Sequence, residues 1–309
     1  MIGIIDGNNL AFSSNMATRL HTADDFPTQA IKGFFVSLRS YMRKFQLAKI
    51  FVVWDGGKSK RRMVICPEYK ANRAVEKTPP EAMAFEEFKM QVPLIKRGLF
   101  DLGATQCVGH LVEGDDIAAL LAMAAENVDT EAIIFSSDAD FLQLVSNKVS
   151  VYSVTSYGKQ ERHTHIGNME KLKGLRPDQW LEYKAMLGDK SDNIAGVKGV
   201  GEKTAKTIMK TFGSLTDFKN VVEGTETCPV KLGKRELSVL ANLELVQRNI
   251  EMMDLRRPAM EFSAVKMFRR GVPNFSALKC LFLEYELKSL YLDFEEWISD
   301  FNCMRTSEA

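Results

Sequence analysis

The chain has 309 residues, of which 45% are hydrophobic and 26% are charged, the composition of an ordinary soluble globular protein. Lys and Arg number 41 and Asp and Glu number 40, so the net charge of +1 points to no class of partner. The five cysteines form no CxxC pair, which argues against a zinc site or a disulfide framework and favours a reducing cytoplasm. The start MIGIIDGNNL does not fit a signal peptide, and no stretch approaches the ~18 apolar residues of a membrane span, so no membrane association is expected.

Short apolar runs followed by aspartate recur along the chain. MIGIID ends in Asp6, IFVVWD ends in Asp55, and EAIIF is followed by SSDAD, which contains Asp138 and Asp140. GNN after Asp6 predicts a turn, and DFLQLV has the spacing of a helix. The helical patterns between the runs extend from Pro27 to about Phe45, from Pro80 to about Leu102 and from Asp115 to about Asn127, and VSVYSVT (149–155) predicts a further strand. Strands alternating with helices predict a mostly parallel α/β sheet flanked by helices.

Further acids follow at the starts of helices and in a loop. VEGDD places Glu113, Asp115 and Asp116 within four residues, more than helix capping requires. LGDKSDN supplies Asp189 and Asp192, whose i,i+3 spacing predicts a shared face. Taken alone, the last pair is typical of a solvated turn, and an aspartate after a strand fits a helix cap as well as a site.

Together these patterns predict that nine carboxylates converge where the strands end. They are Asp6, Asp55, Glu113, Asp115, Asp116, Asp138, Asp140, Asp189 and Asp192. Such a cluster repels itself and raises several pKa values unless divalent cations bind. Oxygen ligands without nearby Cys or His favour Mg²⁺ or Mn²⁺ over zinc, and two such ions ~4 Å apart promote in-line displacement at phosphorus. The predicted chemistry is phosphodiester hydrolysis by metal-activated water.

The stretch GVKGVGEKTA (196–205) predicts contact with a nucleic-acid backbone. Its glycines let backbone amides approach a phosphate, and nearby lysines add positive charge. These residues are Gly196, Gly199, Gly201, Lys198, Lys203 and Lys206. The pattern reads as helix, tight turn and helix, and it looks like a helix-hairpin-helix DNA-binding motif. An ordinary helix–helix turn is the alternative, disfavoured because the motif directly follows a DxxD pair.

A basic stretch with an aromatic residue, PEYKANR, lies between the second strand and the long helix. Tyr69 is suited to stack on a base while Lys70 and Arg73 meet phosphate, and KSKRR (58–62) adds charge beside Asp55. The alternative is a solvated basic loop. Pro79 and Pro80 further on predict a break between two helices.

The ordered set IIDGNN, WDG, PEYKANR, EGDD, SSDADFLQL and LGDKSDNIAGVKGVGEKTA covers about residues 1–250. On these motifs the sequence resembles the 5′ nuclease superfamily, in its bacteriophage and bacterial flap endonuclease (5′–3′ exonuclease) branch. The resemblance implies a PIN-like catalytic domain over 1–175, with a helical arch at about 70–100 through which a single-stranded flap passes. It implies a helix-hairpin-helix and helical region over 176–309, and cleavage near single-strand/double-strand junctions with a free 5′ end, leaving a 5′-phosphate.

The resemblance also assigns roles to residues. The seven acids from Asp6 to Asp140 match one metal site and its surroundings, and Asp189 and Asp192 correspond to a second site that Asp138 and Asp140 also approach. Lys70 and Arg73 match the pair that engages the scissile phosphate, and Tyr69 matches a base-stacking position. Family members also bind a monovalent cation, often K⁺, through backbone carbonyls of the hairpin.

The polymerase region that bacterial repair polymerases fuse to this nuclease is absent from the sequence. We therefore expect a free-standing, monomeric phage enzyme that removes RNA primers during DNA replication in an infected bacterium, with a cellular homologue as the alternative. The expected substrates are DNA with a 5′ flap or overhang and RNA/DNA hybrids. The tail beyond about residue 255 predicts helical packing or a docking surface for a single-strand-binding or replication protein.

Two other classes of protein are compatible with part of the pattern. A PIN-type ribonuclease shares the acids but should lack the hairpin and the arch. A catalytically silent DNA-binding scaffold should have lost acids, and all nine are present.

Overall fold

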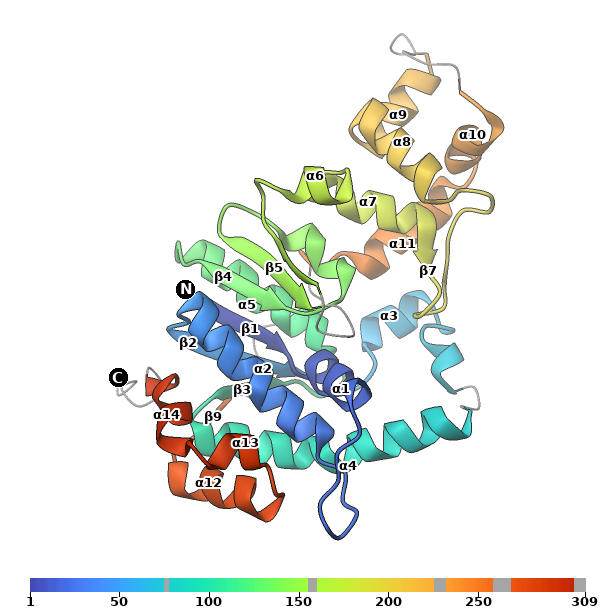
Figure 1. Cartoon of the computed structure of the whole chain (residues 1–309). Helices are drawn as coiled ribbons and strands as arrows, with labels where there is room; N and C mark the ends of the chain where they lie inside the picture. Colours follow the sequence, from blue (N-terminus) through green and yellow to red (C-terminus); the bar gives the residue numbers. More distant parts are fainter. Residues whose placement is uncertain (75–77, 155–159, 225–231, 258–267, 303–309) are drawn as a thin grey trace.

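The computed structural model describes residues 1–74, 78–154, 160–224, 232–257 and 268–302. Its centre is a seven-stranded sheet with the order β6-β5-β4-β1-β2-β3-β9 (Figure 1). The strands are β1 Ile2–Asp6, β2 Lys49–Trp54, β3 Thr105–Val108, β4 Ala132–Phe135, β5 Val149–Val154, β6 Glu161–Thr164 and β9 Phe268–Arg270. Strands β5, β4, β1, β2 and β3 are parallel, and β6 and β9 pair antiparallel at the two edges. The predicted mostly parallel sheet is confirmed.

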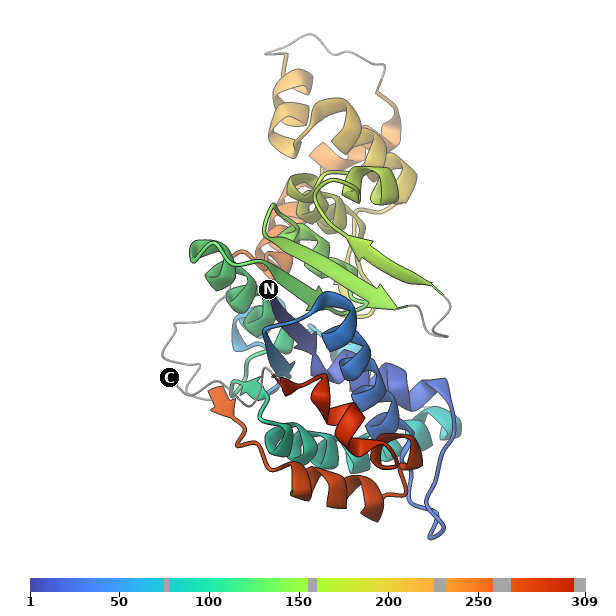
Figure 2. The ribbon, with the colours of Figure 1, turned by 60° about the vertical axis from the view of Figure 1, so that its left-hand side comes forward.

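Both faces of the sheet are covered, which explains why the strands are continuously apolar. Neighbouring residues of β1 point to opposite faces: Ile5 packs among side chains of α1, α2 and α4, and Ile4 packs among side chains of α5. Figure 2 shows these two helical layers on either side of the strands. The helices beside the sheet are α1 Gly7–Ala17, α2 Gln29–Phe45, α4 Pro79–Leu102 and α5 Gly114–Asn127, with a short 3₁₀ helix η2 Ala139–Leu144 after β4.

The position of β1 creates a crevice at one edge of the sheet. From β1 the chain crosses to β2 and β3 on one side and later returns to β4 and β5 on the other. At such a reversal the loops after two neighbouring strands diverge, and ligands bind between them. Asp6 and Asp138 follow the two strands that flank this point.

Of two local predictions around these aspartates, one is wrong and one is confirmed. The GNN stretch begins helix α1 rather than a turn, because the Asp6 side chain accepts a hydrogen bond from the backbone N–H of Asn9 and caps that helix. The helix predicted for DFLQLV is present as the short 3₁₀ helix η2, which ends at Leu144.

The arch region contains one long helix instead of two. Pro79 and Pro80 are the first residues of α4, where a missing backbone N–H leaves no hydrogen bond unmade. Thr78 and Glu81 form a capping box with each other in front of them. Two short helices precede this element, α3 Lys60–Ile65 and the 3₁₀ helix η1 Ala71–Ala74, and residues 75–77 lie outside the described part.

A second group of helices lies beyond the β4–β5 side of the sheet (Figure 1). Its elements are α6 Met169–Lys173, α7 Pro177–Leu187, β7 Gly188–Asp189, β8 Ile194–Ala195, α8 Glu202–Phe212, α9 Leu215–Val222, α10 Lys234–Leu240 and α11 Leu243–Met253. The predicted tight turn is present, since the Val200 backbone N–H donates to the Val197 carbonyl at 3.0 Å, but the small β7–β8 hairpin, rather than a helix, directly precedes it on the connection from α7 to α8. Gly196 permits this path, since a Cβ there would lie 2.0 Å from the carbonyl oxygen of Leu187.

The end of the described chain returns to the N-terminal sheet. Strand β9 pairs with β3, and helices α12 Phe275–Glu284, α13 Lys288–Tyr291 and α14 Phe294–Ser299 follow. Phe282, Trp297 and Phe301 are fully or almost fully buried in the same core as Phe35. The predicted helical packing of the tail is observed, but residues 268–302 pack on the N-terminal unit rather than with the rest of the 176–309 region. Among the described residues, none of the helices combines the length and apolar character of a membrane span.

Candidate active site

Four carboxylates from four different elements influence one another at the crevice. Asp6 ends β1, Asp55 follows β2, Asp115 lies in the first turn of α5 and Asp138 follows β4. Burial, followed by the charges of the other three acids, raises the pKa of Asp115 well above its ordinary value. Burial likewise raises the pKa of Asp6 to about 6, with a contribution from Asp55 and Asp138. The four acids thus form one electrostatically unfavourable cluster, as the sequence predicted for this edge.

Hydrogen bonds from the chain hold these acids in place. Asp6 accepts from Ser136 Oγ at 2.9 Å, and Asp55 accepts from Asn8 Nδ2 at 2.6 Å and from the Gly114 backbone N–H at 2.7 Å. Asp138 accepts from the backbone N–H of Asp140 at 2.8 Å. These bonds explain why each acid stands directly beside a helix start or a tight turn.

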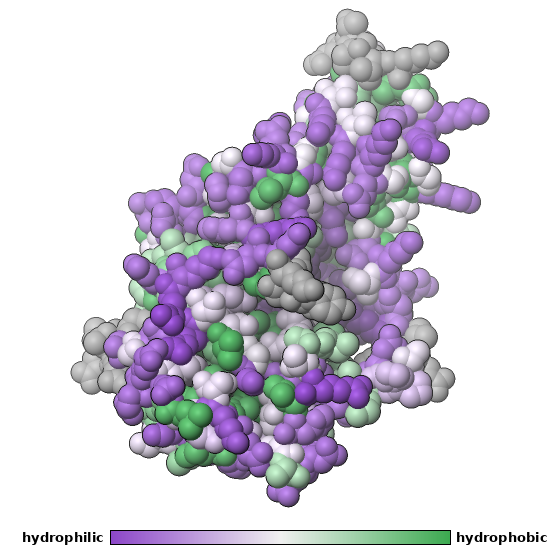
Figure 3. All heavy atoms as spheres, viewed as in Figure 1, coloured by the Kyte–Doolittle hydropathy of each residue, from purple (hydrophilic) through white to green (hydrophobic). Residues whose placement is uncertain are grey.

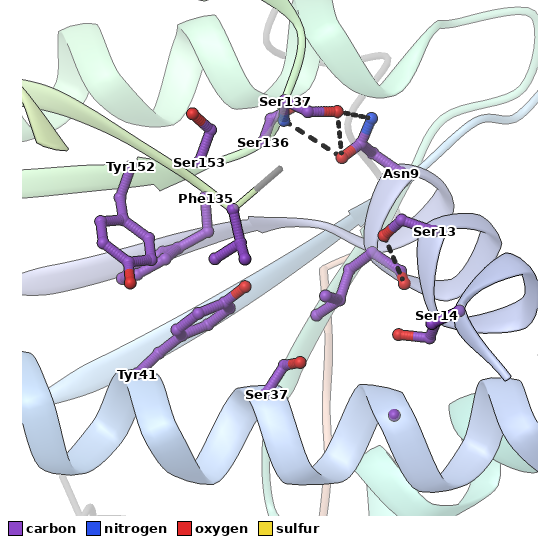
Figure 4. A pocket seen from close by; sticks show the side chains of 14 residues that line it. Asn9, Ser13, Ser14, Ser37, Tyr41, Phe135, Ser136, Ser137, Tyr152 and Ser153 are labelled. Atoms are coloured by element: carbon purple, nitrogen blue, oxygen red, sulfur yellow. Dashed lines mark hydrogen bonds between the residues drawn. The ribbon is translucent and has the colours of Figure 1, made fainter. Parts of the chain in front are cut away.

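Asn9 links the start of helix α1 to the loop after β4. Its side-chain oxygen accepts from the Ser137 backbone N–H at 3.1 Å, and its amide donates to Ser137 Oγ at 2.8 Å (Figure 4). The GNN pattern predicts only a turn for Asn8 and Asn9, although their place directly after Asp6 indicates a supporting role.

Glu113 and Asp116 lie beside buried cations. Arg62, only 4% exposed, donates to both oxygens of Asp116 at 2.7 Å and to Glu113 at 2.9 Å. Burial alone would raise the pKa of Glu113, yet Lys70 and Arg62 hold it below its ordinary value. Asp116 therefore lies in a buried ion pair rather than with the four crevice acids. The KSKRR run was expected to be part of a basic surface, and its pattern gave no sign that Arg62 points inward.

The PEYKANR stretch contacts the acids from the other side. The Lys70 Nζ lies 2.9 Å from Glu113 Oε1, and Arg73 donates to Asp192 Oδ1 at 2.7 Å. Tyr69 is only 3% exposed, because its hydroxyl donates to Glu113 Oε2 at 2.8 Å. The predicted stacking of Tyr69 on a base does not fit this conformation, since the phenol requires a buried hydrogen-bond partner and its ring is covered.

The remaining acids pair with different cations, although the charges of Asp189 and Asp192 both add to burial in raising the pKa of Asp138. Asp189 is in β7 and lies 3.3 Å from Lys184 Nζ, whereas Asp192, in the loop before β8, faces Arg73. Lys184 also lies 3.0 Å from Asp140, and although burial opposes the shift, the two carboxylates raise the pKa of this lysine. Burial raises the pKa of Asp140 to about 6. Lys184 was not predicted, because a single lysine on an amphipathic helix carries no distinguishing pattern.

The carboxylates have the chemistry of a hard-cation site, but in this conformation they are not close enough together to form one. Among the described residues, no three Asp, Glu, His or Cys side chains lie close enough together to hold an ion, and the contacts above engage many of their oxygens. The raised pKa values of Asp6, Asp115 and Asp138 mean that ionisation of the cluster is unfavourable without added positive charge. All-oxygen ligands of this kind suit Mg²⁺ or Mn²⁺.

The residues of the predicted helix-hairpin-helix motif lie directly before α8 and within it. Gly199 has a φ of +84°, and a Cβ at Gly199 or Gly201 would contact no atom within 4 Å, so their backbone faces open space. Lys198 and Lys203 are exposed. Lys206 is half-buried, and its Nζ lies 3.5 Å from Glu202 and 5.6 Å from the ring of Tyr183. The open backbone and the lysines have the form required of a phosphate contact.

Comparison with known proteins places both parts of the chain. Residues 1–173 match the family model described as 5′-3′ exonuclease, N-terminal resolvase-like domain, and residues 175–272 match 5′-3′ exonuclease, C-terminal SAM fold. The thermostable DNA polymerase I of Thermus filiformis is 31% identical over 296 residues, which cover 94% of this chain and 33% of that protein. That of Thermus thermophilus is 36% identical over 256 residues, covering 82% and 28%. The chain thus spans a third or less of the length of these relatives.

Solved structures share the fold over nearly the whole chain. A crystal structure of the T5 D15 protein co-crystallised with metal ions superposes with a TM-score of 0.64, 23% identity and 99% coverage of both chains. The catalytic core of Rad2 in complex with a DNA substrate gives a TM-score of 0.59 at 18% identity, covering 97% of this chain and 92% of that one. At these identities the likeness concerns the fold alone, and it confirms the predicted architecture.

Proposed function

Because the chain belongs to the 5′–3′ exonuclease family, which includes the flap endonucleases, we propose that it is a Mg²⁺-dependent 5′ nuclease acting on branched DNA. In this proposal it hydrolyses phosphodiesters near single-strand/double-strand junctions that have a free 5′ end, and it leaves a 5′-phosphate. Removal of RNA primers during DNA replication is the proposed biological use. The chain is proposed to act as a monomer, with DNA and RNA/DNA hybrids as substrates.

One observation carries the proposal: Asp6, Asp55, Asp115 and Asp138 come from four separate elements, and their mutual repulsion adds to burial in raising the cost of ionising Asp6 and Asp115. Structural acids are usually paired with cations, as Asp116 is with Arg62, so an unpaired cluster at a sheet's switch point favours a cation site. These four acids are proposed to hold one divalent ion, with Glu113 and Asp116 supporting them. Asp140, Asp189 and Asp192 are proposed to hold a second.

Divalent ions in such a site lower the pKa of a bound water and stabilise charge on a phosphoryl group. The chain's own cations have a complementary part. Lys70 and Arg73 now contact Glu113 and Asp192, and we propose that both exchange these contacts for the scissile phosphate when DNA enters. Lys184 lies between Asp140 and Asp189 and holds these two acids of the second group in place until then.

The grip on duplex DNA is assigned to the hairpin. The backbone N–H groups near Gly199 and Gly201 and the side chains of Lys198, Lys203 and Lys206 are proposed to contact phosphates of one strand, without reading bases. A K⁺ ion bound by carbonyls of the same hairpin is part of this proposal. The region from about 70 to 100, with helix α4, is proposed to enclose the single-stranded flap.

Cleavage of a labelled 5′-flap duplex, with Mg²⁺ and with EDTA, tests the proposal. We expect a labelled product only with Mg²⁺ and only when the 5′ end is free. A matched single-stranded RNA and a blunt duplex serve as controls. Preferred cleavage of the RNA would indicate a PIN-type ribonuclease, and binding of the flap without cleavage in either buffer would indicate a catalytically silent scaffold.

A further inference from the structure

Two adjoining cavities lie on the β4–β5 side of the crevice. One, of about 180 Å³, lies between α1, α2 and the ends of β4 and β5 (Figure 4). The other, of about 230 Å³, extends toward β6 and α6. The two share the hydroxyl-bearing residues Ser13, Ser136, Ser137 and Ser153, so they form one continuous depression beside the crevice. Asp138 and Ser136, at its crevice end, belong to the site described above, but no function assigned above uses the rest of it.

The outer cavity is lined by two cations, Arg162 of β6 and Lys173 at the end of α6. Burial, and then the charges of Arg162 and Lys206, lower the pKa of Lys173. The lysine is therefore held half-buried against like charge, which is unfavourable unless an anion binds there. Its environment differs from that of Lys184, which lies between two carboxylates.

The positive charge continues from this cavity to α8. A Cβ placed at Gly174 would lie 3.4 Å from the Nζ of Lys210, so the end of α6 touches the helix that carries Lys206. Lys203, Lys206 and Lys210 also line a shallow hollow on α8 with Glu202 and Thr207. Hydrophilic residues cover much of the visible face that extends from the sheet to α8 (Figure 3).

An acidic group lies at each end of this path. Glu202 lies beside Lys206 at the α8 end, and Asp138 lines the outer cavity at the crevice end. Glu161 of β6 pairs with Lys44 of α2, and Arg162 donates a long hydrogen bond, 3.4 Å, to Gln160. The centre of the path therefore combines cations and hydroxyl groups, which are the donors that bind phosphate oxygens.

We propose that Arg162, Lys173 and the hydroxyl-lined cavity beside them bind a backbone phosphate of the nucleic acid. This contact lies between the proposed phosphate contacts on α8 and the crevice. This inference rests on the proposed nuclease function and deepens it. The site is specific for the phosphodiester backbone of a duplex that extends from the crevice toward α8. A terminal 5′-phosphate is the alternative source of the same chemistry, disfavoured because a single end group needs no continuation through Lys206 and Lys210.

Binding titrations in EDTA separate this site from catalysis, because no cleavage is needed to read them. Arg162→Gln with Lys173→Gln should flatten the plot of log affinity against log salt by roughly one to two units, since each lost phosphate contact removes ~0.9. Lys173→Arg should retain the wild-type slope. Lys171→Gln is the matched control, because Lys171 is exposed on the same helix and lines neither cavity. An equal loss in the control would overturn the proposal.

A scan with single uncharged methylphosphonates along each strand then locates the contact. At one or two adjacent positions the neutral linkage should weaken wild-type binding by roughly threefold to tenfold and leave Lys173→Gln unaffected. If the effects of the methylphosphonate and of Lys173→Gln on affinity add at every position, a specific phosphate contact is refuted. Dependence on a terminal 5′-phosphate alone would refute the backbone assignment. The flap assay can show no cleavage while the neutral linkage still weakens binding of the wild type and not of Lys173→Gln. In that case the nuclease proposal fails and this one stands.

Discussion

The Lys70 Nζ lies 2.9 Å from Glu113 Oε1, and the two residues are only 7% and 3% exposed. Lys70 therefore has a structural contact in addition to its proposed role at the scissile phosphate. Removal of one partner from a buried ion pair leaves the other charge poorly compensated, although Arg62 and Tyr69 still contact Glu113.

We accordingly expect Lys70→Met to lower the free energy of unfolding by roughly 1–3 kcal/mol and to reduce single-turnover cleavage at saturating enzyme by ~10²–10³. Urea unfolding and rapid-quench kinetics measure the two effects. Lys60→Met, at an exposed position of α3, is the matched control and should change neither. A stable variant with full activity would remove Lys70 from both roles.

Two acids with raised pKa values, Asp6 and Asp140, predict that the metal-free protein loses stability as the pH rises. The pKa values of Asp6 and Asp140 are raised to about 6, above the unfolded value near 4, so the folded state binds more protons. Their stability contribution is complete below about pH 4 and is lost as the pH rises through about 6. For Asp6 the difference is on the order of 2–3 kcal/mol.

Thermal melts in EDTA at buffer values from about pH 4.5 to about pH 8 measure this loss. Asp6→Asn should reduce the decline and raise the melting temperature of the metal-free protein at the alkaline end, whereas Asp24→Asn, at an exposed position, should not. Added Mg²⁺ should stabilise the wild type more at the alkaline end than at the acidic end. An equal gain from Mg²⁺ at both ends would contradict the assignment of these acids to a cation site.

Sequence patterns predicted the architecture and the edge at which the acids gather. Strands β1, β2 and β4 are apolar on both faces and each is followed by an aspartate, so position alone brought Asp6, Asp55 and Asp138 to the crevice. Strand β9 was not found, because its three residues FRR are all exposed and carry no strand pattern. Its partner β3 lies between two helices, where a four-residue strand is easily missed.

The sequence patterns did not predict whether a polar side chain points into the protein or toward solvent. Arg62 and Lys60 stand in one basic run, yet Arg62 is buried against Asp116 and Lys60 is exposed. Tyr69 resembled a surface stacking residue, and its burial follows from a hydrogen bond to an acid more than forty positions away in the chain. Contacts of this kind depend on the packing of α3 against α11 and α5, which local periodicity does not encode.

Asp138 separates catalysis from binding. Asp138→Asn removes one charge from the proposed ion site and retains an oxygen that accepts the Asp140 backbone N–H, so folding should persist. We expect cleavage to fall below detection while affinity for junction DNA stays equal or rises slightly, because less negative charge faces the phosphates. Flap cleavage and fluorescence anisotropy on the same substrate measure both. Full cleavage by this variant would exclude Asp138 from the metal site.

The hairpin lysines should affect affinity without affecting the chemical step. Lys203 is exposed and Lys206 half-buried on α8, away from the crevice acids, where they can neutralise duplex phosphates. Lys203→Ala with Lys206→Ala should weaken binding of every sequence alike and flatten the salt dependence by roughly one to two units. Saturating enzyme should then restore most of the single-turnover rate, in contrast to Lys70→Met.

A control for general charge loss is Lys219→Ala, because Lys219 lies on α9 and pairs with Glu223 at 3.7 Å. Lys206 also lies 3.5 Å from Glu202, so its removal frees a carboxylate that repels DNA. Glu202→Gln in the double variant should therefore recover a small part of the affinity but leave the flattened salt slope in place, since no phosphate contact is regained. A double variant that keeps the wild-type slope, or that stays slow at saturating enzyme, would show that α8 does not grip the duplex as proposed.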